Sequence, residues 1–177
     1  EAENIEIIDK SIRPSLLKVD SSIFENNPYY KAIKIKSIKD GKYFLGNIQY
    51  YPYQSFAYDD ATTLDDDYYR EISRIGYLDH KLPFLAISKD NVIWMSNTPN
   101  EALTMQETIK RSHGNVITFG LGLGYYPFMC AIKDEVKSIT VIDKQGECWY
   151  NHYVLINFLG GNKMKKIVRG LTALILA

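Results

Sequence analysis

The stretch NVITFGLGLGYYPFMCA, residues 115–131, contains a short apolar run, then three glycines that alternate with leucine, then a second apolar run. The first run is typical of a buried strand and the second of a helix, so the glycines form the turn between them. Such a turn leaves the first N–H groups of the helix unpaired, and glycine lets a ligand approach the backbone closely. The stretch therefore predicts either a ligand-binding turn or a turn that serves packing alone.

The sequence beyond this turn continues to alternate between strands and helices. Apolar runs predict strands at residues 138–143 and 165–170, with a helix over residues 147–160 between them. Strands that alternate with helices pair in parallel through right-handed crossovers. The sequence therefore predicts an α/β fold in which residues 97–177 form a Rossmann-like partial parallel sheet of order 3-2-1.

A helix is also expected immediately before the strand that leads into the turn, over residues 98–114. Thr98 and Glu101 have the spacing of a capping box. Pro99 suits the first helical position, and Gly114 is expected to close the helix.

Residues 1–96 are expected to form a small β-rich domain. Alternating apolar residues and turn signals predict two hairpins, with strands at residues 30–38 and 42–53 and at residues 84–88 and 92–96. A short helix is expected between them, over residues 64–78, with Asp65, Asp66 and Asp67 near its start, where the helix dipole favours acids. A metal site is the alternative interpretation of this acidic cluster.

The spacing of the glycines favours one class of cofactor over another. Dinucleotide-binding folds use GxGxxG, whose third glycine would fall where this chain has Tyr125. The chain instead has GxGxG, formed by Gly120, Gly122 and Gly124. Asp143 ends the next strand, 19 residues after Gly124, where an acid can accept hydrogen bonds from ribose hydroxyls. Packing alone would not require this acid, so the turn and Asp143 together indicate a nucleoside cofactor.

Over residues 98–170 the chain resembles the class I S-adenosylmethionine-dependent methyltransferases, whose first motif is a GxGxG turn beneath the cofactor. The resemblance implies an S-adenosylmethionine site formed by Gly120, Leu121, Gly122, Gly124, Tyr125 and Asp143, with Asp143 on the ribose. The related aminopropyltransferases, such as spermidine synthase, share this core and carry an N-terminal β domain. Two positions depart from the family pattern: Thr118 stands where an acid is usual, and Leu171 follows Gly170 where an acid is common. Both departures weaken the cofactor affinity that the resemblance implies.

The resemblance implies methyl transfer to an acceptor that the sequence does not identify, and it assigns no catalytic residue. The family core has seven strands, whereas three are expected here, so we expect either a truncated enzyme or a sheet edge covered by another chain. One alternative is a non-catalytic self-association module with a degenerate cofactor turn, forming homo-oligomers through the open sheet edge or the N-terminal domain. The other is an aminopropyltransferase-like protein, which would need a second acid besides Asp143.

Composition argues against several other classes. Apolar residues make up 46% and charged residues 24% of the 177 residues, which is typical of a globular chain, and zero net charge gives no support for nucleic-acid binding. No run approaches the roughly 20 apolar residues that a membrane helix needs. Cys130 and Cys148 lack metal-ligand spacing, so we expect small buried residues in a reducing cytoplasm and no metal site. His80, His113 and His152 are scattered and form no catalytic grouping.

Overall fold

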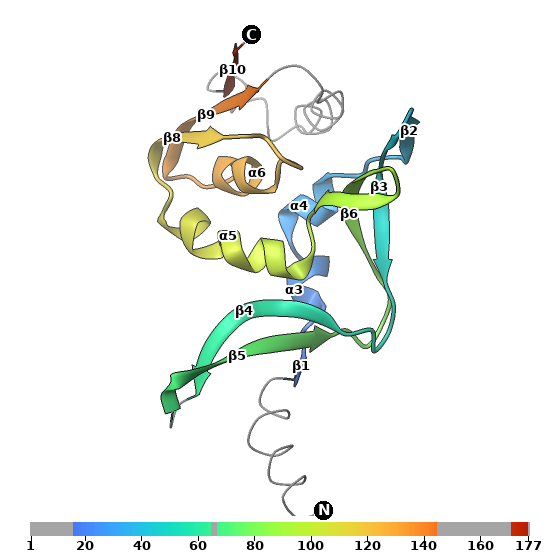
Figure 1. Cartoon of the computed structure of the whole chain (residues 1–177). Helices are drawn as coiled ribbons and strands as arrows, with labels where there is room; N and C mark the ends of the chain where they lie inside the picture. The colour runs from blue at the N-terminus through green and yellow to red at the C-terminus, as the bar shows by residue number, and fades with distance from the viewer. Residues whose placement is uncertain (1–15, 65–66, 145–170, 177) are drawn as a thin grey trace, which may run out of the picture.

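The structure of the chain, a computed structural model, is a mixed α/β arrangement in which strands predominate (Figure 1). It describes residues 16–64, 67–144 and 171–176. Within these residues the strands form three sheets, of which one is antiparallel, one mixed and one parallel.

The antiparallel sheet has the order β2-β3-β6-β7, with β2 at Ile38–Asp40, β3 at Tyr43–Tyr50, β6 at Leu82–Lys89 and β7 at Val92–Ser96. The turns of both predicted hairpins are confirmed, since β2 pairs with β3 and β6 pairs with β7. Both turns use left-handed backbone: Gly41 has a φ of +55°, and Asp90 and Asn91 have φ values of +51° and +63°. Glycine, aspartate and asparagine adopt this conformation more readily than other residues, which explains why these turns were predictable.

The predicted strand before β2 begins within a helix, and its residues 33–37 belong to neither a helix nor a strand. Helix α3 spans Ser22–Glu25 and helix α4 spans Pro28–Ala32. The side chain of Asn27 accepts a hydrogen bond from the Tyr29 N–H at 2.9 Å, and Pro28 takes the first helical position. An asparagine cap followed by proline is a strong helix start. The prediction of a strand over residues 30–38 is therefore wrong for all but its last residue, which begins β2.

The mixed sheet occupies the place of another predicted element. Strand β4 at Phe56–Leu64 and strand β5 at Asp67–Tyr77 form an antiparallel pair, and β1 at Leu16–Lys18 lies parallel to β5. The predicted helix over residues 64–78 is therefore wrong. Tyrosine and isoleucine, which recur along β5, favour strands when a partner strand is available. Asp67 begins β5, whereas Asp65 and Asp66 lie outside the described residues.

The parallel sheet has the order β10-β9-β8, with β8 at Gly114–Phe119, β9 at Val136–Lys144 and β10 at Leu171–Leu176. The predicted pairing of the first two strands is confirmed, because Val116 lies opposite Ile139 in a parallel register. The third strand differs from the prediction, since the strand beside β9 is β10, with Leu171 opposite Ile139. The predicted strand at residues 165–170 and the predicted helix at residues 147–160 lie outside the described residues.

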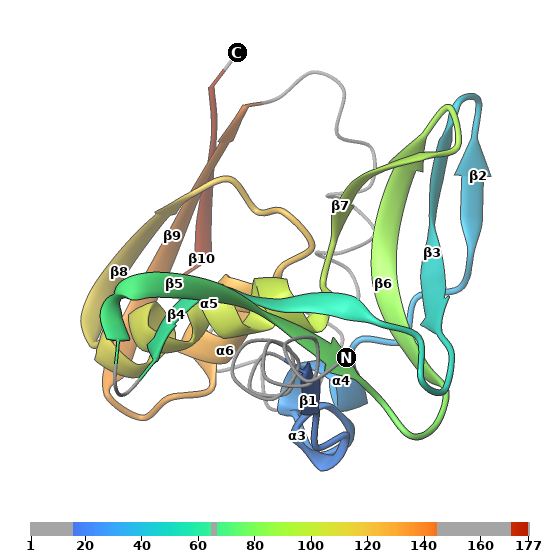
Figure 2. The same cartoon turned by 60° about the horizontal axis from the view of Figure 1, so that its bottom comes forward.

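Two helices lie on one side of the parallel sheet (Figure 1). Helix α6 spans Tyr125–Ala131 and lies against β9, and helix α5 spans Pro99–Arg111 and lies against α6 and β4. In Figure 1, α6 lies below the parallel sheet, α5 lies below α6, and the pair β4–β5 lies below α5. Figure 2 shows the antiparallel sheet standing on the opposite side of these helices from the parallel sheet.

The ends of α5 differ from the sequence prediction. Thr98 precedes the helix as predicted, but its side chain makes no capping hydrogen bond and hydrogen-bonds Tyr50 instead, so the capping box is wrong. The helix ends at Arg111, and Gly114, with a φ of +63°, begins β8 rather than closing the helix. The ammonium group of Lys133 donates hydrogen bonds of 2.7–2.8 Å to the carbonyls of Ile109, Lys110 and Ser112, where a cation opposes the negative end of the helix.

One hydrophobic cluster extends across the predicted domain boundary. It joins residues before the boundary to residues from the parallel sheet and α6: Tyr29, Ile33, Ile35, Leu45, Leu85 and Ile87 with Val116, Leu121, Leu123, Tyr125, Phe128, Cys130, Ala131, Ile139 and Val141. Cys130 is fully buried in α6, as expected, whereas Cys148 lies outside the described residues. The described residues on the two sides of the predicted boundary therefore share a core, and the division of the chain into domains 1–96 and 97–177 stays a prediction.

Candidate functional site

The glycine turn has an unusual backbone. Gly120, Gly122 and Gly124 have φ values of +80°, +54° and +80°, so all three lie in the left-handed region that other L-residues rarely adopt. Between them, Leu121 and Leu123 are 5% and 4% exposed. The alternation of glycine with leucine therefore has a physical basis, because each leucine anchors the turn in the core while each glycine permits the reversal of the backbone.

No described residue fills the outer side of the turn. A Cβ placed on Gly120 or Gly122 would meet no heavy atom within 4 Å among the described residues beyond its chain neighbours. Two other glycines contrast with this, since a Cβ on Gly46 would come within 2.6 Å of Phe44 and a Cβ on Gly76 within 2.8 Å of Phe56. Internal packing thus accounts for Gly46 and Gly76, whereas at Gly120 and Gly122 the backbone faces space that the described residues leave open to a ligand.

The turn begins beside the end of β9. The N–H of Gly120 donates a hydrogen bond of 2.7 Å to the carbonyl of Ile142, which lies opposite Phe119 in the sheet. Asp143 is the next residue of β9, and on its other side it pairs with Ile175 of β10. The backbone of Asp143 therefore lies at the carboxyl end of the middle strand, next to the start of the glycine turn, as the sequence predicted. Ligands of parallel α/β sheets bind at this edge.

A buried hydrogen-bond network fixes the far end of the turn to the N-terminal part of the chain. The hydroxyl of Tyr29 donates to the carbonyl of Leu123 at 2.6 Å and accepts from the Asn97 side-chain amide at 2.7 Å. The hydroxyl of Tyr30 donates to the Asn97 carbonyl at 2.9 Å. Burial raises the pKa of Tyr29 and that of Tyr30 above the ordinary range, so both hydroxyls keep their protons and act as donors. No motif in the sequence indicated this network.

Tyr125 contributes a buried side chain to the same region. It is 7% exposed, its hydroxyl accepts a hydrogen bond from the Asn27 amide at 3.0 Å, and its ring lies 5.2 Å from that of Tyr29. Burial raises its pKa, while the bond from Asn27 opposes the rise. The side chain of Tyr125 therefore serves packing. Tyr125 begins α6, and its role at a cofactor stays a prediction.

The neighbouring Tyr126 is half-buried on α6. Burial, helped by a hydrogen bond with Cys130, raises the pKa of Tyr126 to about 12. Thr118, the departure from the methyltransferase pattern, lies on β8 two residues before Gly120. Among the described residues the turn is therefore surrounded by backbone amides, hydroxyls and neutral side chains, with the backbone of Asp143 beside it. Such an arrangement can hold and orient a ligand.

Among the described residues no group of three histidine, cysteine, aspartate or glutamate side chains is placed to hold a metal ion. No helix in that part of the chain is long and apolar enough to cross a membrane.

Comparison with protein-family models, with curated proteins and with solved structures gives no match for the chain.

Proposed function

We propose that the chain binds S-adenosylmethionine at the turn Gly120–Gly124 and belongs to a methyltransferase-type enzyme whose parallel sheet is the first part of a Rossmann-like unit. The observation that carries the proposal is the backbone of the turn: three left-handed glycines, with open space beside Gly120 and Gly122, directly after β8. The position of Asp143 beside the turn supports it, because the cofactor has a ribose whose hydroxyls an acid can bind.

The residues present fit this cofactor through backbone contacts. Gly120 and Gly122 would lie against the nucleoside, Leu121 would hold the turn from within the core, and Gly124 and Tyr125 would present main-chain groups at the start of α6. When bound, the cofactor supplies a methyl group on a positively charged sulfur, which is a good leaving group. The task of the chain is then to orient cofactor and acceptor, and proximity alone contributes a large part of such rate enhancements. No residue of the chain is assigned to the acceptor or to proton transfer.

The structure also offers an observation in favour of self-association. Strand β8 ends the parallel sheet among the described residues, and on its open face Ile117 is 62% and Phe119 is 81% exposed. Exposed apolar side chains on an edge strand favour pairing with another chain. A homo-oligomer formed through β8 is therefore the second candidate, and it is compatible with cofactor binding at the adjacent turn.

Isothermal titration calorimetry with S-adenosylmethionine and, in parallel, with NAD tests the proposal. We expect binding of S-adenosylmethionine and none of NAD, because Tyr125 stands where the NAD fingerprint has glycine. A carboxylate hydrogen bond is worth about 1.5–3 kcal/mol, so Asp143→Ala should weaken binding about 10- to 150-fold. Absence of S-adenosylmethionine binding at millimolar concentration would refute the proposal, and unchanged binding in Asp143→Ala would refute the ribose assignment.

A further inference from the structure

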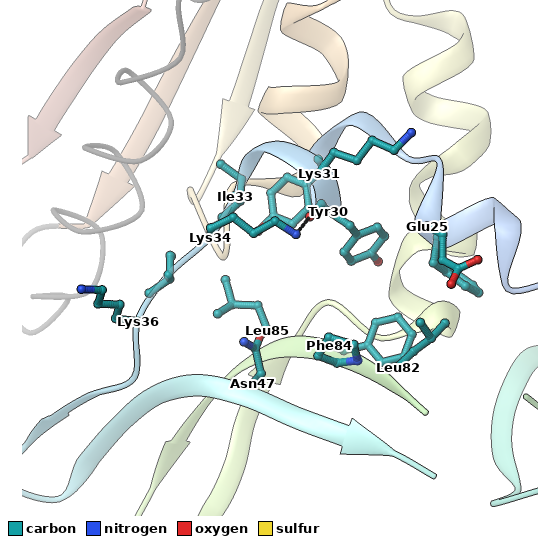
Figure 3. A pocket seen from close by; sticks show the side chains of 14 residues that line it. Glu25, Tyr30, Lys31, Ile33, Lys34, Lys36, Asn47, Leu82, Phe84 and Leu85 are labelled. Carbon is teal, nitrogen blue, oxygen red and sulfur yellow. Dashed lines mark hydrogen bonds between the residues drawn. The ribbon is translucent and has the colours of Figure 1, made fainter. Parts of the chain in front are cut away.

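A cavity of about 540 Å³ lies between the α3–α4 segment and strands β3 and β6 (Figure 3). None of residues 120–124 lines it. Its volume is within the range of about 300–1,000 Å³ that is usual for small-molecule sites. Figure 3 shows Tyr30 and Ile33 on one wall, and Phe84 and Leu85 on the facing wall. The interior of the cavity is therefore largely apolar.

The mouth of the cavity carries positive charge. Lys31, Lys34 and Lys36 line it from the α4 side, and all three are exposed. The ammonium of Lys34 donates to the Tyr30 carbonyl at 2.8 Å, and that of Lys31 donates to the Asn26 side chain at 3.2 Å. Within the part of the chain that the structure describes, none of the three lysines pairs with a carboxylate.

Glu25, an acidic residue that lines the cavity, contacts a histidine instead of a lysine. Its carboxylate lies 3.0 Å from the Nε2 atom of His80. The mouth therefore has three cations and one acid, on a chain whose formal net charge is zero. A local excess of positive charge over an apolar interior attracts molecules that carry a negative group on an apolar body.

We propose that this cavity binds a small, freely diffusing amphipathic anion, with the apolar body between Ile33 and Phe84 and the carboxylate, or an equivalent anion, against Lys34 and Lys36. The long lysine stems cover apolar surface while their ammonium groups reach water, so they can move aside as the ligand enters and then contact its charge. Asn47 faces the cavity from β3 and supplies a neutral hydrogen-bonding group (Figure 3). No residue of the glycine turn lines the cavity, although Tyr29, which does line it, donates a hydrogen bond to the Leu123 carbonyl of that turn.

Calorimetric titration with octanoate, 1-octanol and octylamine separates the apolar contribution from the charge, because the three probes share one chain length. Octanoate should bind most tightly and octylamine most weakly. Each exposed ion pair contributes about 0.2–1 kcal/mol, so the double variant Lys34→Gln/Lys36→Gln should weaken octanoate binding about 2- to 30-fold and leave octanol binding unchanged. The control Lys39→Gln/Lys137→Gln removes the same charge from residues that do not line the cavity and should change neither affinity.

A second variant tests the location. Asn47→Trp places a large ring in the cavity and should abolish binding of both octanoate and octanol, while the thermal midpoint shows whether the chain still folds. Equal affinity for octanoate and octanol, no binding of either, or undiminished octanoate binding in a folded Asn47→Trp chain would each overturn the proposal. The alternative outcome is that the unmodified chain cosediments with anionic phospholipid vesicles while the double lysine variant does not. That result would assign the site to a membrane lipid and overturn the proposal of a freely diffusing ligand.

Discussion

Substitution of Gly122 by alanine separates the conformational role of the glycine turn from its proposed binding role. Gly122 has a φ of +54°, and a Cβ there would meet no heavy atom of the described chain within 4 Å beyond its neighbours. The new methyl group therefore creates no clash with the described residues. What remains is the cost of left-handed backbone for an L-residue, about 1–2 kcal/mol, which corresponds to a fall of about 2–8 °C in the thermal midpoint for a chain of this size.

Gly41 provides a matched control. Its φ is +55°, a Cβ there also meets nothing within 4 Å, and it lies in the hairpin turn between β2 and β3. Gly41→Ala and Gly122→Ala should therefore lose similar amounts of stability, because they have the same backbone strain and the same lack of internal contact.

The two variants should differ in binding. If the nucleoside approaches the backbone of the turn, the methyl group of Gly122→Ala displaces it and leaves polar groups unsatisfied, at about 1–3 kcal/mol or roughly a 5- to 150-fold loss of affinity. Gly41→Ala should bind S-adenosylmethionine as the unmodified chain does. Calorimetric titration and thermal denaturation of the three proteins measure both quantities. If Gly122→Ala binds within twofold of the unmodified chain, the ligand does not approach this glycine and the reasoning is refuted.

Three further outcomes are expected. Tyr29→Phe leaves the Leu123 carbonyl and the Asn97 amide without their buried partner, so urea denaturation should show that the free energy of unfolding falls by about 1–3 kcal/mol. Tyr53→Phe, at a side chain that is 73% exposed, should leave the free energy of unfolding almost unchanged. Hydrogen bonds that the His80 ring donates to the carboxylates of Asp79 and then Glu25 raise the pKa of His80 above its usual 6.5. The contribution of His80 to stability is therefore full below about pH 6.5 and lost as pH rises through the folded-state pKa, and His80→Gln should remove this part of the pH profile in thermal melts. Phe119→Lys places a charge on the open face of β8 and should shift any dimer toward monomer in sedimentation velocity, while Lys137→Gln should not; an unchanged distribution would exclude this face as the contact.

The sequence predicted best those elements whose signals are local. The hairpin turns at Gly41 and at Asp90–Asn91 were predictable because few residue types tolerate left-handed backbone. Strand β8 and helix α6 were predictable because an apolar run, glycines and a second apolar run follow one another without interruption. In each case the residues that decide the conformation lie within a few positions of one another.

The elements that the sequence mispredicted depend on distant partners. The stretch at β5 contains acids and apolar residues at helical spacing, but it becomes a strand because β1 and β4 pair with both of its edges. Thr98 has the spacing of a capping residue, but its side chain hydrogen-bonds Tyr50 on β3. The start of α4 is different, since Asn27 and Pro28 carried a local helix signal that the alternation of the following residues outweighed in the prediction.

The candidate site shows the same division between local and distant causes. Its glycines can be identified from the sequence, but what holds them cannot, because the bond from Tyr29 to the Leu123 carbonyl joins residues 94 positions apart. Asn97, at the predicted domain boundary, bonds to both Tyr29 and Tyr30 and so connects α4 to the end of β7 and the start of α5. The conformation of the turn is therefore set from both sides of that boundary. A ligand that binds the turn would consequently stabilise the N-terminal segment as well, since both depend on the same buried network.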